Sequence, residues 1–282
     1  MMISDKSSSP GQVVFFRGVG DWTPDYGVGA DIVNTILADN PSIGPDAPYL
    51  MDTTCHTAWD KEESFGWVFD IWRRKKLRAA VSDEISRDER QRRGHSEITR
   101  NENMRLVDGL KDVADYLFKG GVAGAYSQQV HDLAASHARL IKGTGPMHSP
   151  LIVMGHSLGT VGAVMYCHYL MNQFTTSQWH DYNLQNHTHL ILVSPAVGFP
   201  SVRNKMARYL PKTYDPAVSL ASARGVMGTS DFMLRIPSYD VQRYNLWTPS
   251  LLAKEHSLRW VAGMGHSFPA LIELRNRGIW VL

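Results

Sequence analysis

The segment that most constrains the fold of this chain is an apolar run leading directly into a glycine-bearing turn. Residues 150–154 (PLIVM) precede residues 155–159 (GHSLG), and residues 160–174 are then apolar almost all round. This pattern predicts a buried strand, a sharp turn and a buried helix. A Cβ at either flanking glycine would collide with the neighbouring strand and helix, so the two glycines fit a turn that holds the Ser157 hydroxyl clear of the backbone.

Further apolar runs recur along the 282 residues, and helical patterns separate them. The predicted strands are 12–16, 48–51, 150–154 and 189–193, with weaker candidates at 221–227 and 232–236; the predicted helices are 30–38, 126–140, 160–174 and 269–279. Alternating apolar strands and helices indicate an α/β fold whose open, mostly parallel sheet is covered by helices on both faces. We expect one domain, residues 1–282, since α/β folds of this length are common.

Residues 64–118 interrupt the strand pattern with a charged, mainly helical stretch that we interpret as a cap or insertion within the domain. Phe65, Phe69 and Trp72 fall on one helical face, and residues 73–76 (RRKK) follow at once. Aromatic rings beside cations suit a lipid headgroup boundary, which makes this segment a candidate for peripheral membrane contact. The alternative is a cap helix packed over the active site or the core, with its charged end in solvent.

The turn at 155–159 resembles the nucleophile elbow of the α/β-hydrolases, and its Gly-His-Ser-Leu-Gly form is similar to that of lipases and esterases. The resemblance is clearest over residues 151–171 and in the first strand-turn unit. It implies an open, mostly parallel sheet with a cap, and Ser157 as the nucleophile. The Leu158 N–H, at the start of the next helix, would then stabilise an oxyanion. The alternative is a serine in an ordinary glycine-rich turn.

A second oxyanion donor is expected in the loop after the first strand. Phe16-Arg17-Gly18 resembles the Phe-Arg-Gly-Thr or Phe-Arg-Gly-Ser segment of the class 3 lipases, and the donor position falls on Val19. Because valine lacks the hydroxyl found in that family, only its backbone N–H would act. Alternatively, the glycines of this turn merely relieve crowding.

In the α/β-hydrolase fold the catalytic acid and then the catalytic histidine come after the serine along the chain, and this order guides the choice of both residues. His266 lies in a glycine-rich loop that opens the last predicted helix, so we favour it over His256, which we expect at an exposed helix start. Asp231 follows a late candidate strand in a turn that resembles the family's acid turn. Asp240 and Asp215 remain alternatives for the acid.

A Ser157–His266–Asp231 triad predicts hydrolysis of carboxylic esters, and lipid or other acyl esters in particular, through an acyl-enzyme that needs no cofactor and no metal. The alternatives are an acyltransferase or thioesterase on the same fold, and a binding protein without catalytic activity. We interpret His180, His187 and His189 as exposed polar residues, since no cysteine or carboxylate with ligand spacing accompanies them.

The net charge limits the expected partners, and the lengths of the apolar runs limit the expected location. Lys and Arg exceed Asp and Glu by two, so no overall field attracts nucleic acid, and the expected partner is a small-molecule or lipid ester. Residues 1–11 are polar and lack the apolar core of a signal peptide, and no run reaches the roughly 18 to 20 apolar residues of a membrane span. We expect a cytoplasmic protein, with a specialised secretion route as the alternative.

Overall fold

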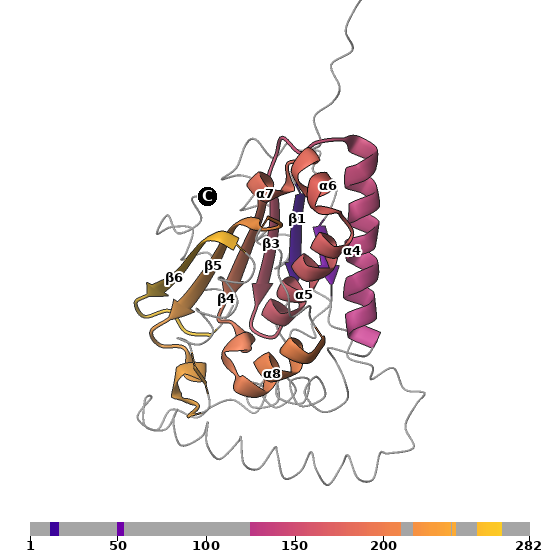
Figure 1. Cartoon of the computed structure of the whole chain (residues 1–282). Helices are drawn as coiled ribbons and strands as arrows, with labels where there is room; N and C mark the ends of the chain where they lie inside the picture. Colours follow the sequence, from indigo (N-terminus) through magenta and orange to yellow (C-terminus); the bar gives the residue numbers. More distant parts are fainter. Residues whose placement is uncertain are drawn as a thin grey trace, which may run out of the picture.

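The computed structural model describes residues 12–16, 50–53, 125–209, 217–237, 239–240 and 253–266. Within these ranges the chain forms an α/β fold around a six-stranded parallel sheet of order β2-β1-β3-β4-β5-β6 (Figure 1). The strands are β1 (Gln12–Phe16), β2 (Leu50–Thr53), β3 (Leu151–His156), β4 (Thr188–Val193), β5 (Leu220–Gly228) and β6 (Ala253–Val261).

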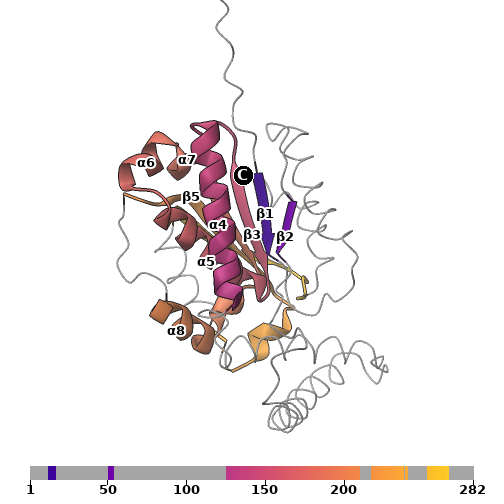
Figure 2. The same cartoon turned by 90° about the vertical axis from the view of Figure 1, so that its right-hand side faces the viewer.

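Two long helices form a layer on one side of the sheet, α4 (Ala125–Thr144) and α5 (Gly159–Asn172), as Figure 2 shows. The shorter helical elements are α6 (Thr176–Asp181), α7 (Leu184–His187), η1 (Ala196–Gly198), α8 (Pro200–Tyr209) and η2 (Phe232–Arg235). None of the helices in these ranges is long and apolar enough to cross a membrane.

Side chains on both faces of the central strands are buried. Val14 and Val153 belong to the core cluster that includes the apolar residues of α4 and α5. Phe15 and Met154, which alternate with them and therefore point to the opposite face, are also fully buried. A parallel strand buried on both faces needs a continuous apolar run rather than an alternating one, which is the pattern that the sequence carries here.

Most of the predicted strands and helices in the described ranges are confirmed to within a few residues. The strand expected at 48–51 lies two residues later, at Leu50–Thr53. The strand expected at 232–236 is wrong, because the Asp231 side chain accepts a hydrogen bond from the Met233 N–H and caps a 3-10 helix there. The helix start expected around His256 is also wrong, since that residue lies in the middle of β6.

Several predictions fall on residues outside the described ranges. They include the insertion at 64–118 with Phe65, Phe69 and Trp72, the oxyanion candidate Val19, the acid candidate Asp215, and the helices at 30–38 and 269–279. The described helices α4 and α5 cover one face of the sheet, so helical cover of both faces stays a prediction.

Two buried histidines of the helical layer predict acid-sensitive folding. Burial lowers the pKa of His137 in α4 and of His168 in α5 from 6.5 to about 4. The unfolded chain therefore binds more protons between these pH values, so stability is full above pH 6.5 and falls as the pH drops toward 4. We expect each histidine to lower the free energy of unfolding by about 2 kcal/mol between pH 7 and pH 5.

Urea unfolding at pH 7, 6 and 5 measures this effect. The His168→Gln variant is the control, because it removes one of the buried titrating histidines, and its stability should depend on pH less steeply than that of the wild type. A free energy of unfolding that stays constant from pH 7 to pH 5 would contradict the prediction.

Candidate active site

Ser157 occupies a strained turn between β3 and α5. Its φ of 53° lies in the left-handed region, which non-glycine residues seldom adopt. The surrounding backbone holds this conformation, because the Ser157 N–H donates to the Val193 carbonyl at 2.9 Å and the Ser157 carbonyl accepts from the Thr160 hydroxyl at 2.6 Å. The Ala196 N–H also donates to that carbonyl, at 3.3 Å. The strand-turn-helix geometry expected from residues 150–174 is thus present.

Gly155 is required by the close approach of the helix to the strand. A Cβ at this position would lie 2.6 Å from the Thr160 Cα and 2.7 Å from the Gly159 carbonyl oxygen, and both are backbone atoms. Real Cβ atoms do not come so close, so a larger residue would push α5 away from the end of β3. This confirms the steric reason for a glycine at the start of the turn.

The parallel sheet gathers the predicted site residues at one edge. Ser157 follows β3, Asp231 follows β5, and His266 follows β6, so all three lie beyond the carboxyl ends of strands that run in the same direction. In the sheet order, β1 lies directly beside β3, with Phe16 opposite Gly155. The strand order reverses there, and ligands of open α/β sheets bind at such a reversal.

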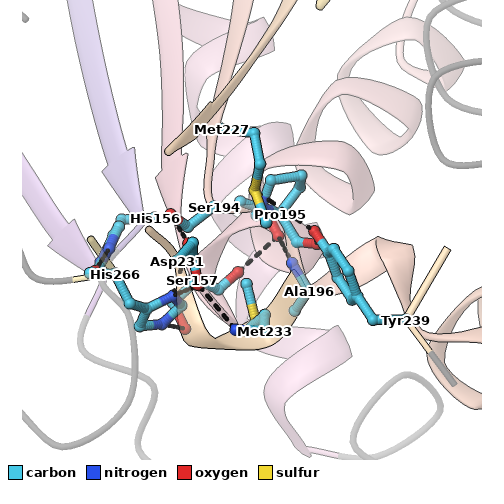
Figure 3. Close-up of polar contacts among 11 residues, drawn as sticks. His156, Ser157, Ser194, Pro195, Ala196, Met227, Asp231, Met233, Tyr239 and His266 are labelled. Carbon is cyan, nitrogen blue, oxygen red and sulfur yellow. Dashed lines mark hydrogen bonds and ion pairs between the residues drawn. The ribbon is translucent and has the colours of Figure 1, made fainter. Parts of the chain in front are cut away.

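The side chains of Ser157, His266 and Asp231 form one continuous chain of contacts (Figure 3). His266 Nε2 lies 2.9 Å from Ser157 Oγ, and His266 Nδ1 lies 3.1 Å from each Asp231 carboxylate oxygen. An ionised carboxylate only accepts hydrogen bonds, so Nδ1 carries the proton and Nε2 is free to accept the Ser157 hydroxyl proton. The arrangement can deprotonate a serine hydroxyl and stabilise the imidazolium that results.

Asp231 is 1% exposed, and three donors hold its carboxylate. Besides His266, the Ser194 hydroxyl donates to Oδ2 at 2.5 Å, and the Met233 N–H donates to Oδ1 at 2.9 Å. Burial by itself would raise the pKa of Asp231. The hydrogen bonds from His266, the charge of His266, and the hydrogen bonds from Ser194 and Met233 lower it more, so the pKa lies below its ordinary value of 3.8. The carboxylate is therefore charged at neutral pH.

Ser194 is a site residue that sequence reasoning missed. It directly follows β4, is fully buried, and has a φ of 48°. Its N–H donates to the Val226 carbonyl at 2.9 Å, which fixes the hydroxyl beneath Asp231. The sequence around Ser194 marked only the end of a strand, because its partner lies 37 residues further on.

Backbone contacts attach the loop that carries His266 to the loop that carries Asp231. The Ser230 N–H donates to the Met264 carbonyl at 3.1 Å, and the Thr229 N–H donates to the Val261 carbonyl at 3.0 Å. The Phe232 ring meets the His266 ring edge-on, with 4.7 Å between the centroids. These contacts hold the His266 ring against the Asp231 carboxylate.

The alternative acids and bases lie elsewhere. His256 has an exposed side chain in β6 and pairs with Ala223, well before the carboxyl end of the strand. Asp240 lies beyond η2, where its N–H donates to the Gly198 carbonyl at 2.9 Å, and the hydrogen bonds of His266 go to Asp231. The geometry thus brings together Ser157, His266 and Asp231.

The three histidines near β4 do not share one environment. His180 is exposed as expected, whereas His187 and His189 are half-buried, and His189 Nδ1 lies 2.9 Å from Ser222 Oγ. Across the described ranges, no group of three or more His, Cys, Asp or Glu side chains is arranged to hold a metal ion.

Leu158 lies at the N-terminal cap of α5, next to Ser157. The first hydrogen bonds of the helix start from the N–H groups of Thr160 and Val161, which leaves the Leu158 N–H ahead of the helical ladder. Such groups have no partner inside their helix and sit at its positive end. The Leu158 N–H can thus serve an anion that forms at Ser157.

Comparison with known proteins adds no family to this geometry. No protein-family model matches the chain, and no curated protein shows significant sequence similarity to it.

Proposed function

We propose that this chain is a serine hydrolase with α/β-hydrolase architecture that cleaves carboxylic esters. The contact chain from Ser157 Oγ through the His266 ring to the Asp231 carboxylate carries the proposal, because each of its distances is 3.1 Å or less. The left-handed conformation of Ser157 at a strand-to-helix turn supports it independently.

In the proposed reaction, Ser157 Oγ attacks the ester carbonyl carbon while its proton passes to His266 Nε2. The tetrahedral intermediate collapses, the proton moves from Nε2 to the leaving alkoxide, and an acyl-enzyme remains on Ser157. Water then donates a proton to His266 Nε2 and attacks the acyl carbon. As this second tetrahedral intermediate collapses, the bond between Ser157 Oγ and the acyl carbon breaks and Oγ takes the proton back from Nε2, which releases the carboxylic acid and restores the free serine. Asp231 stays ionised and stabilises the imidazolium in both steps.

The negative charge that develops on the carbonyl oxygen needs preorganised donors. The Leu158 N–H is one candidate, because it precedes the first hydrogen bonds of α5. The Val19 N–H is the proposed second donor. Its support is the pairing of β1 with β3, since Phe16, three residues before Val19, lies opposite Gly155 at the start of the turn that carries Ser157.

Lipid or other acyl esters are the proposed substrates, which would make the chain a lipase, a phospholipase or an esterase. This part of the proposal comes from the Gly-His-Ser-Leu-Gly resemblance and from the aromatic and basic residues 65–76. The same residues support the proposal that Phe65, Phe69 and Trp72 contact a lipid surface. The proposed mechanism uses no cofactor and no metal.

Fluorophosphonate labelling tests the central claim. A fluorophosphonate phosphonylates a serine, with loss of fluoride, only when a neighbouring base activates it. The wild-type protein should therefore carry one adduct on Ser157, located by peptide mass spectrometry. The Ser157→Ala and His266→Ala variants should carry none. The matched control is His256→Ala, which removes an exposed histidine of β6 and should leave labelling unchanged.

A panel of p-nitrophenyl esters of increasing chain length, together with phospholipids, then tests the substrate class. Activity that rises with acyl length supports lipid esters, and activity on acetate alone contradicts them. An added alcohol acceptor separates hydrolysis from acyl transfer, because a transferase forms the new ester. An unlabelled wild-type protein that is folded would overturn the hydrolase proposal and favour a binding protein.

A further inference from the structure

His156 directly precedes Ser157 and contacts the histidine that serves it. It is the last residue of β3, and its side chain is buried. Its Nε2 lies 2.8 Å from the main-chain carbonyl oxygen of His266, 110 residues away in the chain. A carbonyl oxygen only accepts, so His156 donates this hydrogen bond. The two imidazole rings also lie close together, with centroids 5.3 Å apart (Figure 3).

The bond from His156 acts on the main chain of His266 itself. Gly263, three residues earlier, has a φ of +75°. Among the described residues, the last backbone hydrogen bond before His266 is the one that the Met264 carbonyl accepts from the Ser230 N–H. These contacts fix the loop as far as Met264, two residues before His266. Within the described ranges, the bond from His156 is the only hydrogen bond made by the His266 main chain.

The bond closes a small circuit of contacts around the nucleophile. Ser157 is covalently linked to His156, whose side chain donates to the His266 carbonyl. The His266 side chain in turn contacts Ser157, with 2.9 Å between Nε2 and Oγ. A rigid strand between β1 and β4 thus carries both the nucleophile and the group that holds its base. Movement of His266 away from Ser157 would break both contacts.

A neutral donor suits this position beside a base that becomes positively charged. Burial first, and then the nearby charge of His266, lower the pKa of His156 from 6.5 to about 3, although its bond to the His266 carbonyl and the charge of Asp231 act in the opposite direction. The His156 ring is therefore uncharged at neutral pH. A lysine in its place would donate a similar bond but would oppose the formation of the His266 imidazolium.

We propose that His156 is a positioning residue, which fixes the main chain of His266 so that its Nε2 stays within hydrogen-bond distance of Ser157 Oγ. The proposal rests on the serine hydrolase function proposed above. His156 touches neither the substrate nor the transferred proton in this role, and it acts only through His266.

Two variants of His156 separate the loss of its hydrogen-bond donor from the change in side-chain volume. His156→Phe keeps an aromatic ring and loses the donor, whereas His156→Gln places an amide N–H close to the position of Nε2. We expect His156→Phe to lower kcat, and the rate of fluorophosphonate labelling, by about 10- to 100-fold with KM changed less than about twofold, since a misplacement of about 1 Å costs about that much. His156→Gln should recover most of the lost rate.

The matched control is His168→Gln, which alters another buried, neutral histidine on α5. It should lower stability without changing the labelling rate of the folded protein. The proton on His266 Nδ1, observed by NMR, gives a readout without turnover, and its downfield signal should weaken in His156→Phe. If His156→Phe does not fold, His156→Asn replaces it, because its shorter amide does not reach the His266 carbonyl.

Equal labelling rates in the wild type, His156→Phe and His156→Gln would overturn the positioning role and leave the hydrolase proposal intact. A folded His156→Gln that labels as slowly as His156→Phe would also overturn it, since donation would then not be the cause. A folded wild-type protein without any labelling would instead remove the hydrolase function, and this role with it.

Discussion

The Asp231→Asn variant is expected to lose about 10⁴-fold in kcat, with KM little changed, because an amide at this position favours the wrong tautomer of His266. The Met233 N–H can only donate, so the amide oxygen will face it at the Oδ1 position. The amide NH₂ then takes the Oδ2 position, where the Ser194 hydroxyl can rotate to accept from it.

His266 Nδ1 lies 3.1 Å from both carboxylate positions, so the new NH₂ group faces it directly. An amide N–H donates to Nδ1 only when that nitrogen carries no proton. The proton then sits on Nε2, which can no longer accept from Ser157. The overall shape stays close to that of the wild type, because aspartate and asparagine are nearly isosteric.

Steady-state kinetics on a p-nitrophenyl ester, with circular dichroism to show that the fold is retained, measures this loss. The control is Asp240→Asn, which changes the alternative acid and should stay within about twofold of the wild type, because Asp231 is the carboxylate that contacts His266. A large loss in Asp240→Asn combined with normal activity in Asp231→Asn would contradict the assignment of the acid.

The Gly228→Ala variant should lower kcat by at least about 100-fold, because the added methyl group would displace the loop that leads to His266. A Cβ at this position would lie 1.9 Å from the Met264 carbonyl oxygen and 2.6 Å from the Met264 carbonyl carbon. Both are backbone atoms, so the loop leading to His266 must shift by about 1 Å or more, and such a misplacement costs about 10²-fold in rate. Overpacking should also lower the free energy of unfolding by about 1–3 kcal/mol.

Gly265→Ala is the matched control, because it adds the same methyl group directly after Met264, in the loop that leads to His266. A Cβ there meets nothing within 4 Å, so activity and stability should remain close to those of the wild type. Kinetics and thermal unfolding of both variants test the steric argument. Equal activity of Gly228→Ala and wild type would show that the His266 loop does not depend on this close approach.

The strands that could be predicted are those whose burial shows in their own residues. β1, β3 and β4 are continuous apolar runs because both of their faces are covered. β6 was missed because Lys254, Glu255, His256, Arg259 and Trp260 have exposed side chains, so this strand lacks an apolar run. Its place in the sheet comes from hydrogen bonds to β5, and the local sequence does not reveal them.

The site residues likewise differ in whether the local sequence reveals them. The turn of Ser157 could be predicted because its causes are local, a strand, a glycine and a helix within about 20 residues. Choosing Asp231 over Asp240 needed the positions of Ser194, Met233 and His266, which come from separate loops. His156 was visible as a member of the turn, but its contact with a carbonyl 110 residues away was not.

By itself, the sequence therefore determined the turn at Ser157 and the parallel α/β sheet, because short-range sterics and the burial of apolar runs act on neighbouring residues. The tertiary structure alone decided which carboxylate meets His266, how Ser194 supports that carboxylate, and why Gly228 must remain a glycine. Those features depend on distances between loops at the carboxyl ends of different strands, and only the assembled sheet sets such distances.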